Sequence, residues 1–121
     1  MIPQLVPADF AAWRTQAAAA LTNGKLPVVL DVREPWELQT ATIAPAECLL
    51  LAVPMREIPA RLAELRNTHG EDQPIACLCH HGMRSLQVAN YLAAAGFTEV
   101  VNLEGGIDAW SRQVDAAVPR Y

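Results

Sequence analysis

The chain has 121 residues, of which 52% are hydrophobic and 18% are charged, and its formal net charge is −4. This length is typical of one domain, and the composition is that of a globular protein and not of a disordered one. The acidic net charge argues against non-specific nucleic-acid binding and against a polybasic membrane-binding patch. We therefore expect a single domain over residues 1–121 that binds neither nucleic acid nor membranes.

The N-terminal residues lack the basic region and apolar run of a signal peptide, and no apolar stretch has the length of a membrane span. The three cysteines, Cys48, Cys77 and Cys79, do not suggest a disulfide framework. Together these features predict a protein of the reducing cytoplasm.

In chain order, the first candidate element is a short edge strand at residues 2–5. Four apolar runs follow it, at residues 28–32, 49–53, 75–79 and 100–103. Each run is nearly continuous and not alternating, which is the pattern of strands that are buried on both faces of a parallel sheet.

Four helical segments are expected around these runs, at residues 7–23, 59–66, 85–95 and 107–114. The third is the clearest, because Leu86 and Leu92 share its apolar face and Gly96 stands where a left-handed C-cap belongs. Strands that alternate with helices predict an α/β fold, in which helices cover both faces of a parallel sheet of about five strands.

Polar or conformationally special residues follow three of the predicted strands. Asp31 and Arg33 close the first long run, residues 79–85 follow the third run, and residues 104–106 follow the fourth. Chemistry in open α/β sheets collects beyond the carboxyl ends of the strands. We therefore expect Asp31, Cys79 and Gly105 at the same edge of the sheet.

Residues 79–85, Cys-His-His-Gly-Met-Arg-Ser, join a predicted strand to a predicted helix. A cysteine at such a turn faces several backbone N–H groups and a helix N-terminus, which favour the nucleophilic thiolate over the thiol. Gly82 allows the backbone to curl around the sulfur, and Arg84 offers a permanent positive charge with a planar fork suited to an oxyanion. The loop therefore combines a nucleophile, its activation and an anion cradle.

This loop resembles the active-site loop of rhodanese-family domains. Two other segments resemble motifs of the same family in the same order, Asp-Val-Arg-Glu at 31–34 and Leu-Glu-Gly-Gly-Ile-Asp-Ala-Trp at 103–110. The final residues 118–121, Val-Pro-Arg-Tyr, look like the tail of many bacterial single-domain members. One stretch departs from the family, which usually has a His-Ile-Pro-Gly-Ala-like turn where residues 42–46 read Thr-Ile-Ala-Pro-Ala. We expect this difference to alter the pocket rim or the choice of partner and not the cysteine chemistry.

The resemblance implies a rhodanese-like domain with sulfurtransferase activity, in which Cys79 and Arg84 are the catalytic residues. A donor such as thiosulfate or a protein persulfide would hand its outer sulfur to Cys79, and a thiol or cyanide would then remove it. The expected substrate-binding residues are His80, His81, Gly82, Met83 and Ser85. Asp31 and Arg33 are expected to support the loops through hydrogen bonds, and neither a cofactor nor a metal is needed.

The other cysteines and a nearby tryptophan have simpler interpretations. Cys48 and Cys77 sit among apolar neighbours, so we expect them to be small buried hydrophobic residues. A zinc site built from Cys77, Cys79 and the adjacent histidines lacks a second ligand pair at a suitable spacing. Trp36 either lines the mouth of the pocket or packs against its neighbours.

Other function classes stay open. Cysteine phosphatases and arsenate reductases have five residues between the cysteine and the arginine of their loop, whereas four residues separate Cys79 from Arg84. The shorter loop makes a smaller cradle, which is better matched to one sulfur than to a tetrahedral phosphate. A non-catalytic interaction module is a second alternative, but inactive relatives typically lack the cysteine that is present here as Cys79. A regulatory sensor that only stores sulfur is the remaining alternative.

Overall fold

The computed structural model describes residues 1–121 and contains a five-stranded sheet in which every strand pair is parallel. The strands are β1 (Gln4–Leu5), β2 (Val28–Asp31), β3 (Leu49–Ala52), β4 (Ile75–Leu78) and β5 (Val100–Leu103). Their spatial order is β1-β5-β4-β2-β3. The predicted α/β fold with a parallel sheet of about five strands is therefore confirmed.

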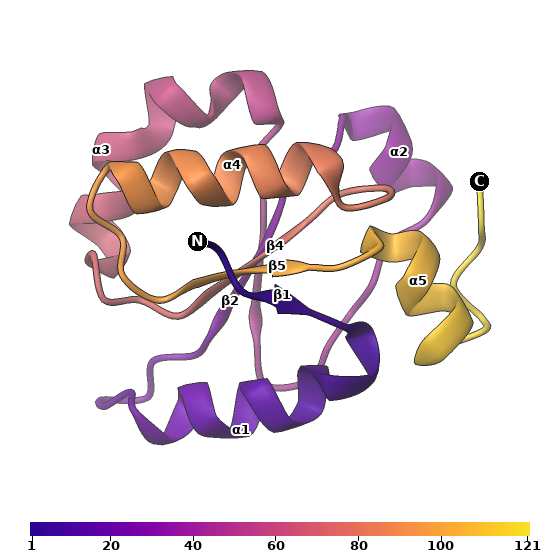
Figure 1. Cartoon of the computed structure of the whole chain (residues 1–121), viewed down its shortest axis with the longest axis horizontal. Helices are drawn as coiled ribbons and strands as arrows, with labels where there is room; N and C mark the ends of the chain where they lie inside the picture. Colours follow the sequence, from indigo (N-terminus) through magenta and orange to yellow (C-terminus); the bar gives the residue numbers. More distant parts are fainter.

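Five helices surround this sheet, α1 (Phe10–Ala19), α2 (Pro35–Thr40), α3 (Ile58–His69), α4 (Met83–Ala94) and α5 (Gly106–Gln113). Single 3₁₀ turns precede α1 and α3. Figure 1 shows α3 and α4 on one side of the sheet and α1 on the other. The helix expected at 7–23 ends at Ala19, because the N–H groups of Ala20 and Leu21 bond three residues back in tight turns.

Helix α2 is not among the predicted helical segments. It has six residues, too few for an apolar periodicity to become visible in the sequence. Its start is specified locally, because Pro35 occupies the first turn and Glu34 and Glu37 form a reciprocal capping box.

The prediction that the run at 49–53 is buried on both faces is wrong. Strand β3 is an edge strand that pairs only with β2, and the side chain of Leu49 remains 40% exposed. Strand β2 lies between β3 and β4 and is completely buried. The two similar apolar runs at 28–32 and 49–53 thus lie in different environments, because the order of strands places one in the centre of the sheet and the other at its edge.

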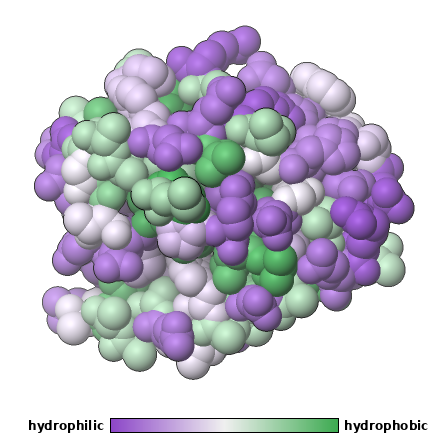
Figure 2. Space-filling view, in the orientation of Figure 1, coloured by the Kyte–Doolittle hydropathy of each residue, from purple (hydrophilic) through white to green (hydrophobic).

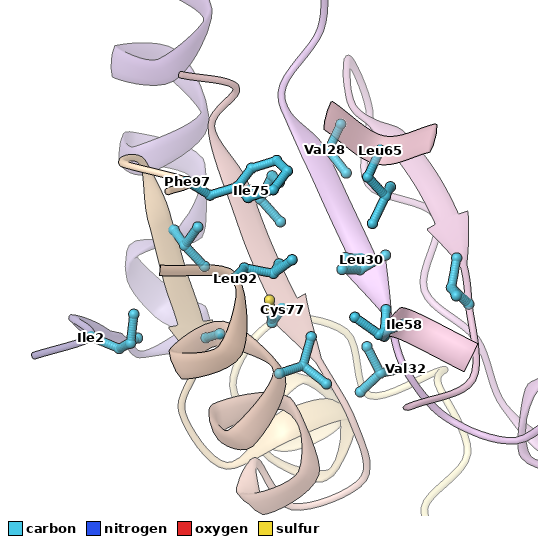
Figure 3. Packing of buried hydrophobic residues seen from close by; sticks show 14 of the residues in the cluster. Ile2, Val28, Leu30, Val32, Ile58, Leu65, Ile75, Cys77, Leu92 and Phe97 are labelled. Carbon is cyan, nitrogen blue, oxygen red and sulfur yellow. The ribbon is translucent and has the colours of Figure 1, made fainter. Parts of the chain in front are cut away.

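The side chains of the central strands divide the core into two layers. One layer packs alternate residues of β2 and β4, including Leu30 and Cys77, against α3 and α4, as Figure 3 shows. The other layer packs Val29 and Leu78 against residues of α1 and α5. On the face drawn in Figure 2, hydrophobic residues lie in small groups between hydrophilic ones. None of the helices combines the length and apolarity that crossing a bilayer requires.

The parallel strands bring three candidate segments to one edge of the sheet. Strands β2, β4 and β5 end at Asp31, Leu78 and Leu103, and the N–H of Val32 bonds to the carbonyl of Leu78 beyond the strand ends. Asp31, Cys79 and Gly105 therefore share an edge, as predicted.

Candidate active site

Cys79 follows β4 directly and lies under the first turn of α4. Cys79 is buried, with only 1% of its surface exposed. The Sγ atom accepts hydrogen bonds from the backbone N–H of Gly82 at 3.1 Å and of Ser85 at 3.3 Å. Gly82 has a φ of +98°, a conformation that favours glycine and that turns the chain back over the sulfur. The loop thus surrounds Sγ with donors, as the sequence predicts.

Four other N–H groups of the same loop donate to no acceptor in the protein, those of His80, His81, Met83 and Arg84. The side chain of Met83 points to solvent and is 69% exposed. These residues therefore offer the loop their backbone donors, and the N-terminus of α4 adds partial positive charge.

The first turn of α5 holds the cysteine loop from the other side. The N–H groups of Ile107 and Asp108 bond to the carbonyl oxygens of Cys79 and His80 at 2.9 and 3.1 Å. A Cβ atom at Gly106 would overlap these two carbonyl oxygens, so the close approach requires glycine. Because α5 binds the loop carbonyls, the loop N–H groups remain free to face the sulfur.

Ser85 connects the sulfur to a buried amide that the sequence analysis missed. Its hydroxyl donates to Oδ1 of Asn102 at 2.6 Å and also lies 3.3 Å from Sγ of Cys79. The Nδ2 atom of Asn102 donates to the carbonyl of Gly82 at 3.1 Å and to Oε1 of Gln4 at 2.9 Å. The available signal was one polar residue in the apolar run at 100–103.

The guanidinium fork of Arg84 is occupied by a carboxylate. Its two terminal nitrogens donate to the two oxygens of Glu37 at 2.7 and 2.9 Å. The hydrogen bonds from Arg84, with a smaller contribution from Tyr121, lower the pKa of Glu37 to about 2, although burial opposes this shift. A direct grip of Arg84 on an anionic donor stays a prediction, and it requires the donor to displace Glu37.

Asp31 and Arg33 form a fully buried ion pair beside this carboxylate. The Nε and Nη2 atoms of Arg33 donate to Asp31 at 2.9 and 2.8 Å, and Nη1 donates to the hydroxyl of Tyr121 at 3.1 Å. That hydroxyl donates in turn to Glu37 at 2.7 Å, and burial raises the pKa of Tyr121 to about 12. The pair therefore braces the end of β2 against Tyr121 and reaches Arg84 only through Glu37.

A stack of rings covers the outside of the loop. The imidazole of His80 lies between the ring of His81, at a centroid distance of 3.9 Å, and the ring of Tyr121, at 3.8 Å. Trp36 meets Tyr121 edge-on at 6.2 Å and is 62% exposed. Of the two alternatives for Trp36, the structure therefore favours a position at the rim over one in the core.

The two remaining cysteines differ in burial. Cys77 is fully buried in the core beside α4, and burial raises the pKa of its thiol. The expected burial of Cys48 is wrong, because this residue is only half-buried and packs against the edge of the second core layer, where partial burial raises its thiol pKa. The core position expected for Cys77 is confirmed. The divergent turn at 42–46 leads toward α1, where Pro45 and Ala46 line a cavity with Phe10, away from the cysteine loop.

Comparison with known proteins agrees with this geometry. Residues 14–113 match the model of the rhodanese-like domain. The chain belongs to this family. It is 33% identical over 93 residues to the thiosulfate sulfurtransferase GlpE of Pseudoalteromonas translucida. The aligned residues cover 77% of this chain and 81% of the relative. The crystal structure of a rhodanese-related protein from Thermoplasma volcanium superimposes with a TM-score of 0.72 at 28% identity, covering 98% of this chain and 99% of the other.

The family also includes much longer proteins. The chain is 34% identical over 93 residues to the rhodanese-like/PpiC domain-containing protein 12 of Arabidopsis thaliana, and this match covers 77% of the chain but 30% of the relative. Rhodanese-like domains therefore occur both as short sulfurtransferases and within larger chains.

Proposed function

We propose that this protein is a sulfurtransferase that carries a sulfane sulfur as a persulfide on Cys79. The observation that supports the proposal best is the position of Sγ, which accepts two backbone N–H bonds at the N-terminus of α4. Two such donors and the helix dipole stabilise a thiolate, which is the form of cysteine that attacks sulfur. The family relationship supports the same chemistry.

The reaction is a double displacement. The Cys79 thiolate attacks the outer sulfur of thiosulfate, a new S–S bond forms, and the bond to the inner sulfur breaks with its electron pair leaving on sulfite. A thiolate or cyanide then attacks the outer sulfur of the persulfide. The bond to Sγ breaks, and its electron pair returns to Cys79 as thiolate. No cofactor takes part, and a protein persulfide can replace thiosulfate as the donor.

The loop binds the transferred sulfur through its backbone. The N–H groups of His80, His81, Met83 and Arg84 are available for the outer sulfur or for the leaving anion, because none has a partner in the protein. Gly82 and Ser85 hold the inner sulfur. Arg84 adds a positive charge near the site, and we propose that donor binding competes with Glu37 for its guanidinium.

Intact mass spectrometry after incubation with thiosulfate tests the proposal. The wild-type protein and the Cys48→Ser and Cys77→Ser variants should each gain the mass of one sulfur atom, which cyanide then removes. Cys79→Ser should gain nothing and should release no thiocyanate. A sulfur adduct on Cys79→Ser, or no adduct on the wild type with thiosulfate or persulfide donors, would refute the persulfide at Cys79.

The length of the loop separates this reaction from phosphate chemistry. With four residues between Cys79 and Arg84, the donors converge close to Sγ, which suits one outer sulfur. We expect thiocyanate release and neither hydrolysis of aryl phosphates nor reduction of arsenate. Inserting one residue between Gly82 and Arg84 should weaken sulfur transfer. Efficient phosphate-ester hydrolysis by the wild type, without any sulfur adduct, would favour the phosphatase class instead.

A further inference from the structure

The hydroxyl of Ser85 has one proton and two acceptors within reach. Oδ1 of Asn102 lies at 2.6 Å and Sγ of Cys79 lies at 3.3 Å. All three residues are buried, so the choice is made without bulk water. A hydroxyl can donate only one hydrogen bond at a time, and it therefore serves either the amide or the sulfur.

The orientation of the Asn102 amide is fixed by its surroundings. Its Nδ2 atom lies 3.1 Å from the carbonyl oxygen of Gly82, which can only accept. The opposite orientation would place two acceptors against each other. Oδ1 must therefore face Ser85, and because Oδ1 carries no proton, the 2.6 Å bond exists only with the Ser85 hydroxyl as the donor.

We propose that Asn102 is a positioning residue that accepts the hydrogen bond of the Ser85 hydroxyl whenever Cys79 is uncharged. When Cys79 becomes a thiolate, the hydroxyl donates to Sγ instead. A neutral thiol or persulfide sulfur is a weak acceptor, so the short bond to the amide prevails. A thiolate carries a full negative charge, and hydrogen bonds to charged groups are the stronger ones. The hydroxyl then rotates toward Sγ, and its O–H bond stays intact.

In the sulfur-transfer cycle this rotation follows the electron pair, a role that rests on the proposed function. When the acceptor takes the outer sulfur, the pair of the broken S–S bond arrives on Sγ and the Ser85 hydroxyl turns to stabilise it. When the next donor is attacked, the charge leaves Sγ and the Ser85 hydroxyl turns back to donate to Oδ1 of Asn102. By competing for the same hydroxyl, the amide weakens the hydrogen bond from Ser85 to the thiolate, and a less strongly stabilised thiolate is the better nucleophile.

The inference predicts opposite effects for two neighbouring variants. Asn102→Ala removes the competing acceptor, so Ser85 donates to the thiolate more strongly. Ser85→Ala removes the donor altogether. The pH at which iodoacetamide alkylates Cys79 at half its maximal rate, here called the alkylation midpoint, should fall in Asn102→Ala and rise in Ser85→Ala. Each shift should be about half a pH unit or more, as expected for one hydrogen bond.

The alkylation midpoint of Cys79 is measured by peptide mapping, so that Cys48 and Cys77 do not contribute. In the double variant Ser85→Ala/Asn102→Ala the midpoint should equal that of Ser85→Ala alone, because Asn102 acts only through the hydroxyl. Gln4→Ala removes one acceptor of the Asn102 Nδ2 atom and leaves the bonds to the Gly82 carbonyl and to Ser85, so its midpoint should match the wild type. Shifts of the same sign in the two single variants would overturn the inference, as would a large effect of Asn102→Ala in the absence of Ser85.

Asn102→Asp covers the case in which Asn102→Ala does not fold. The aspartate keeps an acceptor for Ser85 and adds negative charge near the sulfur, so the alkylation midpoint should rise, and a fall would contradict the inference. Alkylation does not require sulfur transfer. Midpoints that shift as expected in a protein that never forms a persulfide would refute the proposed function and leave the role of Asn102 intact.

Discussion

Replacing Glu37 by glutamine tests the central ion pair of the site. Glu37 is only 2% exposed and receives two hydrogen bonds from Arg84 and one from Tyr121. Glutamine keeps the shape of the side chain and one acceptor oxygen, but it removes the negative charge. We therefore expect a large loss of stability with little change in packing.

The depressed pKa of Glu37 gives the magnitude of this loss. The folded protein lowers the pKa from its ordinary 4.5 to about 2, and each tenfold change in acidity corresponds to about 1.4 kcal/mol. The ionised carboxylate thus contributes on the order of 3 kcal/mol to the free energy of unfolding at neutral pH. Glu37→Gln should lower the free energy of unfolding at pH 7 by about this amount.

The pH dependence has a definite sign. Because the unfolded chain binds a proton at Glu37 more tightly than the folded protein does, the contribution is complete above about pH 4.5 and is lost as the pH falls toward about 2. The stabilities of the wild type and of Glu37→Gln should therefore converge in this acidic range. Taking the difference between the two proteins cancels the titration of the other carboxylates.

Urea unfolding followed by tryptophan fluorescence, from pH 7 down to about pH 2.5, measures this difference. Glu64→Gln is the matched control, because Glu64 pairs with Arg61 at 2.8 Å but both side chains are well exposed. A solvent-screened pair of this kind should contribute less than about 1 kcal/mol. A loss below about 1 kcal/mol for Glu37→Gln at pH 7, or a loss that is the same at pH 7 and pH 2.5, would refute the argument.

Three other variants test the surroundings of the sulfur. Cys77→Ser places a hydroxyl in the apolar core, so the free energy of unfolding in urea should fall by about 1–3 kcal/mol. Sulfur transfer per folded molecule should persist, and its loss in the folded variant would contradict a purely structural role for Cys77. Arg84→Lys keeps the charge but loses the planar fork that can grip two oxygens of the donor once Glu37 is displaced, so thiosulfate turnover should fall about tenfold or more. Unchanged kinetics would show that the guanidinium does not act on the donor. Gly106→Ala pushes a methyl group against the carbonyls of the cysteine loop, so both Tm and turnover should drop; wild-type values for both would mean that α5 can move aside.

The sequence predicted the strands and helices that are specified by residue patterns within their own segments. The runs at 28–32 and 75–79 are recognisable because the central strands are buried on both faces, and residues 79–85 carry their own turn and helix start. The exposure of β3 depends on the strand order of the whole sheet, which no local pattern contains. The six residues of α2 are too few to establish a helical period.

The partners of the loop were harder to predict than the loop itself. Glu37 and Arg84 are 47 residues apart, and neither residue type indicates that the other is its partner. Tyr121 looked like part of a family tail, and its contact with Glu37 spans 84 residues. Asn102 was the exception. A polar side chain inside a buried strand needs a hydrogen-bond partner, so the sequence alone could have marked this residue as part of a polar network. The cytoplasmic location and the extent of the domain over residues 1–121 stay predictions.

The ion-pair network also changes the expected origin of the anion cradle. Asp31 pairs with Arg33 and Glu37 pairs with Arg84, with the hydroxyl of Tyr121 between the two ion pairs, so the four charges largely cancel next to the loop. Attraction for an anionic donor must then come mainly from the backbone N–H groups and the N-terminus of α4. These partial charges are fixed in place and act on the transferred sulfur whatever group delivers it. Discrimination between thiosulfate and a protein persulfide is therefore expected from the exposed rim, where Trp36 lies, and not from the loop that holds the sulfur.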